Sequence, residues 1–218
     1  MKVVYNKSFP PGTTDFAPVI RAVAATNPDI VVVCSYPLSS VGIVQSVNEL
    51  GFKPKMIGGE MVGLQATVFK DRLKSKLNGF INYETWVPSP KLMARAKPFF
   101  DKYQARAKEA GVDPLGYYLG GWGYADFQVL AAGVEGAKSL DDAKIADWLH
   151  HNEVHTVIGD ISFGPEGEWT KPALMQVQYH DLTDAANLDT WRGMSYQNVV
   201  YPADQKTGDV IYPYEKAK

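Results

Sequence analysis

Apolar positions along the first third of the chain switch repeatedly between strand and helix spacing. After Thr14 or Asp15, which can cap a helix, apolar residues follow at 3.6-residue spacing: Phe16, Val19, Ile20, Val23 and Ala24. Residues 30–34 form an unbroken apolar run, which predicts a strand covered on both faces. Further strands are predicted at 2–6, 55–57 and 80–86, and further helices at 39–51 and 64–76. This alternation predicts an α/β fold built on a doubly wound parallel sheet.

The middle third of the chain has mainly helical patterning. Ser89 followed by Pro90 is typical of a helix start, and this helix is predicted to end at Gly111. A second helix is predicted over 117–138, where Gly120–Gly123 favour close helix packing. A third is predicted to begin at the capping-box form of Ser139–Asp142 and to run to about His151. Strands are predicted at 157–163 and 173–179, joined through a turn at 164–167. The remainder is polar and aromatic with weak periodicity.

Composition indicates a globular chain without an obvious charged partner. The 218 residues are 45% hydrophobic and include 9 Phe, 5 Trp and 12 Tyr. These aromatic side chains can bury more apolar surface than those of a disordered chain. The net charge of −2 gives no indication of nucleic acid or a membrane surface as partner. The longest strictly apolar run is too short for a transmembrane helix, and Cys34 is the single cysteine. No secretory signal follows Met1, so a chain starting there would be cytoplasmic.

Candidate catalytic and metal-binding groups are weak. His150, His151 and His155 crowd together beside Glu153, but the β-branched run 154–158 indicates that the helix has already ended, so a solvated helix end is favoured over a zinc site. Cys34 has no histidine near it in sequence, which favours an unreactive thiol. The chain lacks a nucleophile elbow, a dinucleotide fingerprint and a Walker loop. These observations predict no catalytic residue, no metal and no cofactor, and therefore not an enzyme.

Glu60 and Tyr36 are stronger candidates because each follows a predicted strand. Gly58 and Gly59 are expected to form a tight turn that places Glu60 at the carboxyl edge of the sheet, where open α/β sheets bind ligands. A carboxylate and an aromatic ring on adjacent strand ends can together hold an ammonium group. The alternative is an exposed loop glutamate beside a half-buried tyrosine.

Ten short segments, taken in order, carry a resemblance to a known family. They are residues 12–16, 27–30, 34–36, 51–55, 58–63, 113–118, 124–125, 156–159, 163 and 167–169. In this order and spacing the chain resembles the carboxyl-terminal portion of type 1 periplasmic solute-binding proteins of ABC transporters, the leucine/isoleucine/valine-binding family. The resemblance covers most of the chain to about residue 180 and implies two α/β lobes that close on a ligand. Most of the first lobe has no counterpart in this chain.

The resemblance also implies a domain plan and a ligand site. Residues 1–85 would form a second-lobe α/β segment, residues 86–165 a mainly helical segment returning to the first lobe, and residues 166–218 closing strands and a tail. Glu60 matches the glutamate that binds the ligand ammonium, Tyr36 a pocket tyrosine, and Tyr118 an aromatic offered by the first lobe. Tyr83 and Trp86 are expected to complete an aromatic lining.

The leading hypothesis is therefore a solute-binding component, or fragment, of an ABC importer. Its partners would be a small molecule (an amino acid, amide or aromatic acid) and the cognate permease, with no nucleic acid, and the resemblance implies a periplasmic location for the full-length protein. The alternative is a ligand-sensing domain of a receptor or regulator with the same fold. A hydrolase or oxidoreductase using Cys34 or the histidines is a distant third. An unpaired sheet edge also predicts self-association of the chain.

Overall fold

The chain folds as two units, which the computed structural model describes for residues 1–171 and 174–218. Unit 1 comprises Met1–Glu84 and Met175–Lys218, and unit 2 comprises Thr85–Leu174. The chain thus leaves unit 1 once, directly after Glu84, and returns to it once. Residues 166–174 belong to unit 2. The expected return of residues 86–165 to a first lobe stays a prediction.

Unit 1 is built on a mixed sheet of five strands among the described residues. These are β1 (Ile30–Ser35), β2 (Met56–Met61), β3 (Ile81–Glu84), β6 (Met175–Tyr179) and β7 (Gln197–Tyr201), in the spatial order β1-β2-β3-β6-β7. The first three are parallel, as the alternating pattern predicts, whereas β6 and β7 are antiparallel to their neighbours. The predicted strand at 173–179 is β6, apart from Ala173, which lies outside the described residues. Weak periodicity after residue 181 gave no prediction of β7.

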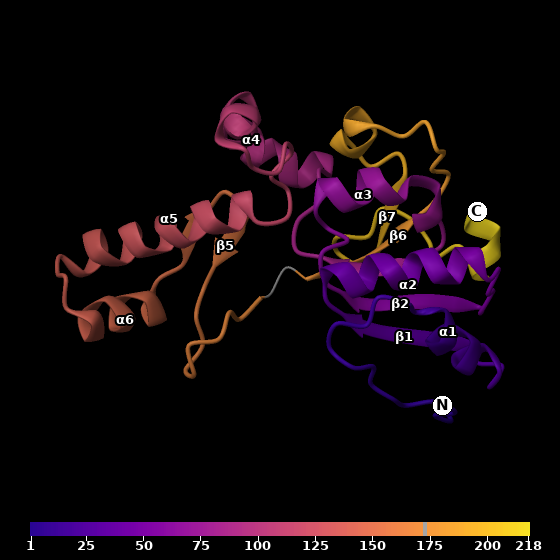
Figure 1. Cartoon of the computed structure of the whole chain (residues 1–218). Coiled ribbons are helices and arrows are strands. Elements are labelled where there is room, and N and C mark those ends of the chain that lie inside the picture. The colour runs from indigo at the N-terminus through magenta and orange to yellow at the C-terminus, as the bar shows by residue number, and fades with distance from the viewer. Residues whose placement is uncertain (172–173) are drawn as a thin grey trace. The chain divides into compact units, whose positions relative to one another are not determined.

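Helices connect the parallel strands of unit 1. They are α1 (Ala17–Ala24), α2 (Pro37–Glu49), α3 (Thr67–Leu73) and the 3-10 turn η1 (Lys74–Leu77). Figure 1 shows α2 running alongside β1 and β2, as expected for the right-handed crossover between two parallel strands. Two further 3-10 turns, η2 (Leu188–Arg192) and η3 (Tyr214–Ala217), lie in the C-terminal part.

The core of unit 1 combines apolar side chains of the sheet, the helices and the C-terminal turns. Val44 and Val47 of α2 are fully buried, as their helical spacing predicts. The aromatic ring of Phe80 meets that of Tyr214 edge-on, with centroids 5.6 Å apart. Other side chains with no exposed surface are Met61, Leu64, Leu77, Val177, Tyr179 and Val199. Burial on this scale supplies the main driving force for folding unit 1.

The described residues of unit 2 form three helices and a hairpin. Helix α4 (Pro90–Ala110) starts where the Ser89–Pro90 pair predicts, with Ser89 Oγ accepting from Leu92 N at 3.3 Å, and ends at Gly111 in the left-handed conformation. Helices α5 (Gly120–Ala137) and α6 (Asp142–His151) follow. The single strand predicted at 157–163 is wrong. The chain instead forms the antiparallel hairpin β4 (Val154–Thr156) and β5 (Gly159–Ile161), because Gly159 at φ 146° permits a tight reversal.

Aromatic residues form the core of unit 2. The Trp86 ring lies 4.5 Å from Phe100 and 5.0 Å from Tyr117, centroid to centroid. The predicted packing role of the glycines at the start of α5 holds for Gly121, where an added Cβ would lie 3.1 Å from Ile158 Cγ2. It does not hold for Gly123, which faces open space. Unit 2 therefore gathers its core around the start of α5.

Two predictions for the edge of the unit 1 sheet are wrong. Residues 2–6 form no strand with any described residue, and Figure 1 shows the N-terminal segment as an irregular trace. Strand β1 is covered on one face only, since Val33 is 9% exposed but Val32 is 74% exposed. The two deviations have separate causes: β1 is the edge strand of the described sheet, and the described residues do not cover the face that carries Val32.

Candidate functional site

The candidate site lies at the carboxyl ends of β1 and β2 in unit 1. In the parallel register, Cys34 of β1 is opposite Glu60 of β2, and Ser35 is opposite Met61. Side chains alternate between the two faces of a strand, so Glu60 shares its face with Cys34, while Ser35 and Met61 point into the core. Tyr36 follows β1 directly as the residue before α2. The register therefore brings Glu60 and Tyr36 to the same edge of the sheet, as predicted.

Two glycines fix the path of β2 just before Glu60. Gly58 and Gly59 have φ of 153° and 138°, values that residues with a Cβ rarely adopt. A Cβ on Gly58 would lie 1.6 Å from the carbonyl oxygen of Ile81 in β3, and one on Gly59 would lie 2.7 Å from that of Val33 in β1. The predicted tight turn at this pair is wrong, because both glycines lie inside β2 and permit close approach of its neighbours.

A buried serine joins the loops after β1 and β2. Ser40 Oγ lies 3.0 Å from the carbonyl oxygen of Tyr36, 2.8 Å from that of Val62 and 2.8 Å from Ser35 Oγ. Gly63 completes the contact, since a Cβ there would lie 2.6 Å from Cβ of Pro37. The backbone on either side of the site is therefore held in place by contacts beneath it.

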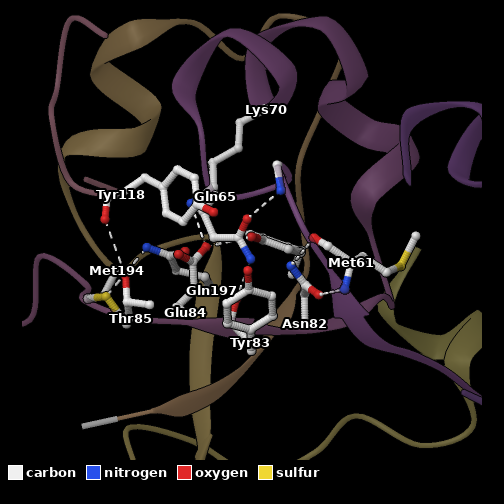
Figure 2. Close-up of polar contacts among 12 residues, drawn as sticks. Met61, Gln65, Lys70, Asn82, Tyr83, Glu84, Thr85, Tyr118, Met194 and Gln197 are labelled. Atoms are coloured by element: carbon white, nitrogen blue, oxygen red, sulfur yellow. Dashed lines mark hydrogen bonds and ion pairs between the residues drawn. The ribbon is translucent and has the colours of Figure 1, made fainter. Parts of the chain in front are cut away.

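Amide side chains continue this network toward β3. Asn82 accepts from Met61 N at 2.9 Å and donates to Met61 O at 3.1 Å, replacing backbone pairing where the β2–β3 register ends. Gln65 accepts from Gly63 N at 2.8 Å and donates to Tyr83 O at 2.9 Å. Figure 2 shows both amides between the strand ends. Buried amides that satisfy backbone groups on two strands rigidify the edge that carries Glu60.

Glu60 and Tyr36 are both open to ligand. Tyr36 is 78% exposed, and Glu60 is an exposed carboxylate with no hydrogen bond or ion pair in the part of the chain that the structure describes. Several other acidic groups of unit 1 form ion pairs, such as Asp29 with Lys55 at 2.7 Å. An unpaired carboxylate beside an exposed ring can accept hydrogen bonds from an ammonium group while the ring faces the cation.

The other predicted lining residues lie elsewhere. Tyr83 is in β3 and 9% exposed, and its backbone is held by Gln65. Tyr118 is in unit 2, half-buried, with its carbonyl oxygen accepting from Thr85 Oγ1 at 3.3 Å. Trp86 is also in unit 2 and only 2% exposed, because it forms the aromatic core there. Of the predicted set, unit 1 brings together Glu60 and Tyr36 at its exposed edge.

Sequence reasoning missed a buried ion pair at the end of β3. Lys70 Nζ lies 2.7 Å from Glu84 Oε1, with side-chain exposures of 10% and 2%. The hydroxyl of the fully buried Tyr179 donates to the same oxygen at 2.8 Å, and burial together with this carboxylate raises the tyrosine's pKa well above its usual value. Figure 2 shows Lys70 and Glu84. Lysine and glutamate in separate elements leave no sequence signal for such a pair.

The histidine cluster contains no arrangement typical of a zinc site among the described residues. Helix α6 ends at His151, as predicted, so His151 and His155 do not share a helix face. Ligand atoms of Glu153, His155 and Asp160 lie within 4.8 Å of one another, all on exposed residues. Asp160 Oδ1, however, is already 2.7 Å from both Arg95 Nη1 and His155 Nδ1, and these bonds lower its pKa. The arginine supplies the charge that a metal ion would provide.

Comparison with known proteins assigns the chain to a protein family. A family model described as periplasmic binding protein matches residues 1–181. The chain therefore belongs to the periplasmic binding protein family, whose members bind solutes and are not enzymes. Among the described residues, no helix has the length and apolar character needed to cross a membrane.

Two curated relatives match about three quarters of the chain. The chain is 25% identical over 168 residues to an amino acid binding protein of Pseudomonas aeruginosa, and 27% identical over 172 residues to a Leu/Ile/Val-binding protein of Citrobacter freundii. These matches cover 77% and 76% of this chain but only 43% and 42% of the relatives. The chain thus spans less than half the length of these curated relatives.

Solved structures share the fold. A leucine-binding protein of Thermotoga maritima superposes with a TM-score of 0.63 at 23% identity, covering 83% of this chain and 51% of that one. A solute-binding protein of an ABC transporter from Rhodopseudomonas palustris, in complex with p-hydroxybenzoic acid, superposes with a TM-score of 0.59 at 14% identity. It covers 97% of this chain and 52% of its own. At these identities the likeness shows the fold.

Proposed function

We propose that this chain is the solute-binding component, or part of one, of an ABC importer, and that it binds an amino acid or a similar small polar molecule. The observation that carries the proposal is that the exposed Glu60 carboxylate and the exposed Tyr36 ring belong to the same carboxyl edge of the parallel strands. An unpaired carboxylate on a preorganised edge is suited to a ligand ammonium group. Relatives named as amino acid and Leu/Ile/Val-binding proteins support this ligand class.

Tyr36 would face the cation or the ligand side chain, and Tyr118 and Tyr83 would contribute aromatic surface when the ligand is enclosed. Trp86 would have to leave its core position to touch a ligand, so its contribution would be support of the Thr85–Leu174 unit. Aromatic acids are the second proposed ligand class, because a solute-binding protein of the same fold was solved in complex with p-hydroxybenzoic acid. The full-length protein would act in the periplasm, where it would deliver the solute to the permease of its ABC importer.

Self-association is part of the same proposal. The outer edge of β1 has free backbone groups and carries Ile30 and Val32, which are 45% and 74% exposed. An unpaired edge strand with an apolar face is a template for pairing with another chain. Two copies of this chain would therefore associate along β1.

A thermal-shift screen of the full chain tests the proposed function. Each of the L-amino acids and a set of aromatic acids, including 4-hydroxybenzoate, is added at increasing concentration. A ligand that binds only the folded state stabilises it by about 2.7 kcal/mol at 100 times its Kd. At least one amino acid is expected to raise the Tm in a saturable manner. A panel without any stabilising compound would contradict the proposal.

A further inference from the structure

Unit 2 by itself forms a groove that none of the proposed solute-binding residues lines. The groove lies between α4, α5 and β4 and has a volume of about 660 Å³. That volume is within the range of pockets that hold small organic molecules. All of its lining residues belong to Thr85–Leu174, so the groove is complete within one unit.

The α4 side of the groove is strongly basic. Arg95, Lys102 and Arg106 are spaced by seven and four residues, which places them on one face of the helix. Arg95 is bound to Asp160, but Lys102 and Arg106 make no ion pair within residues 1–171 and 174–218. No aspartate or glutamate is among the groove's lining residues. Two unpaired cations therefore face a groove whose own lining contains no carboxylate.

The apolar wall of the groove consists of stacked aromatic rings. Phe99 of α4 stacks on Tyr124 of α5, with centroids 4.8 Å apart and planes at 26°, and lies 6.0 Å from Tyr103. The Tyr103 ring rests against bare backbone, since a Cβ on Gly116 would lie 2.3 Å from it and one on Gly120 2.9 Å. Side chains at Gly116 and Gly120 would clash with the Tyr103 ring, so the glycines permit its position. A ring fixed in this way presents a preformed flat surface to a ligand.

The tyrosine hydroxyl adds a neutral hydrogen-bond donor. The Tyr103 hydroxyl is protonated at neutral pH, and burial and the nearby Asp113 raise its pKa further above the usual value. A protonated phenol can donate to an anionic oxygen without repelling it. Cations and this donor thus complement one kind of ligand group, an anion.

We propose that this groove is a second binding site, for a small molecule with a planar aromatic body and a carboxylate. The ring would pack on Phe99 and Tyr124, and the carboxylate would receive hydrogen bonds from Arg106 and Lys102. The guanidinium fork of Arg106 matches the geometry of a carboxylate, and apolar surroundings on one side strengthen the charge-assisted bonds. This site is separate from Glu60, which belongs to unit 1.

The experiment is a calorimetric titration of the full chain with 2-naphthoate and with its uncharged analogue 2-naphthamide. Three variants are compared with the wild type: Lys102→Gln with Arg106→Gln, Arg106→Gln alone, and Lys108→Gln as the matched control. Lys108 is an exposed cation of the same helix that does not line the groove. Amide shifts in a two-dimensional NMR spectrum of the wild type locate the bound ligand.

We expect 2-naphthoate to bind with 1:1 stoichiometry and to shift amides of α4, α5 and β4. The double variant should weaken binding about tenfold or more, Arg106→Gln alone about three- to fivefold, and Lys108→Gln less than twofold. The amide analogue should bind at least about fivefold more weakly than the acid. The proposal would be overturned by a titration that does not saturate or by equal affinity for acid and amide. It would also be overturned by equal effects of Arg106→Gln and Lys108→Gln, or by amide shifts confined to unit 1.

Discussion

Unit 1 and unit 2 bury their side chains in different ways. In unit 1 the sheet, helices and C-terminal turns enclose Phe80, Val177 and a complete ion pair between Lys70 and Glu84. In unit 2, helix α6 has no buried residue, and Phe127 of α5 is 72% exposed. The core of unit 1 is thus closed and includes a buried ion pair, whereas the core of unit 2 depends mainly on one aromatic cluster. The contrast predicts unequal sensitivity to substitution.

The largest difference is expected for charged groups. Glu84→Gln removes the counter-charge of the buried Lys70 and should destabilise the chain by about 3–5 kcal/mol in urea unfolding. In unit 2, Asp101→Asn breaks the Lys97–Asp101 pair, in which both side chains are more than half exposed, and should cost no more than about 0.5 kcal/mol. Similar costs for the two variants would show that the Lys70–Glu84 pair is not buried in solution.

A pair of buried tyrosines in unit 1 gives the next largest effect. Tyr179→Phe loses the hydrogen bond to the Glu84 carboxylate and should destabilise by about 1.5–3 kcal/mol at pH 7. The Tyr214 hydroxyl has no hydrogen-bond partner among the described residues, so Tyr214→Phe should change stability by less than about 0.5 kcal/mol. Urea unfolding of both variants at pH 7 checks the comparison, and a larger loss for Tyr214→Phe would contradict it.

The same tyrosines predict an alkaline loss of stability. Burial raises the pKa of Tyr214, and burial with Glu84 raises that of Tyr179, both from an ordinary value of 10.0. Because the folded pKa exceeds the unfolded one, their stabilisation is complete below pH 10 and falls as pH rises above it. Tyr214→Phe should therefore flatten the decline between pH 10 and 11. An unchanged slope would mean that Tyr214 is solvated.

The smallest effect on stability should come from the exposed apolar groups, which act on association instead. Val32→Lys on the β1 edge and Phe127→Lys on α5 should each change the free energy of unfolding by less than about 0.5 kcal/mol. If copies pair along β1, Val32→Lys should shift the chain toward monomer in size-exclusion chromatography with light scattering, and Phe127→Lys should not. A monomeric wild type, or the opposite ranking, would refute pairing through this edge.

Local patterns were sufficient to predict much of the fold. The Ser89 cap located α4 and apolar spacing located α1, although the N-cap of α1 is Phe16 rather than Thr14 or Asp15. The alternation of strands and helices predicted the parallel order of β1, β2 and β3. The failures are non-local. Whether residues 2–6 form a strand depends on a neighbouring strand, and whether β1 is covered on both faces depends on what packs there; neither is encoded in the local pattern.

Only the part of the candidate site that depends on local sequence patterns was predictable. Strand ends can be placed from sequence, and Glu60 and Tyr36 each follow from a strand end. The roles of Ser40 and Asn82 could not be predicted, because their partners are backbone groups 21 to 22 residues away. The burial of Trp86 likewise depends on α4 and on the loop before α5, which bring Phe100 and Tyr117 onto it.

The most direct test of the central claim, that Glu60 binds a solute ammonium group, is a calorimetric titration of one amino acid into three forms of the chain. The ligand is the amino acid that stabilises the wild type most, and the forms are wild type, Glu60→Gln and Glu49→Gln, an exposed glutamate at the end of α2. The account predicts that Glu60→Gln weakens binding by at least about tenfold, about 1.4 kcal/mol, while Glu49→Gln stays within twofold. Amino acid affinity of Glu60→Gln within twofold of the wild type would contradict it.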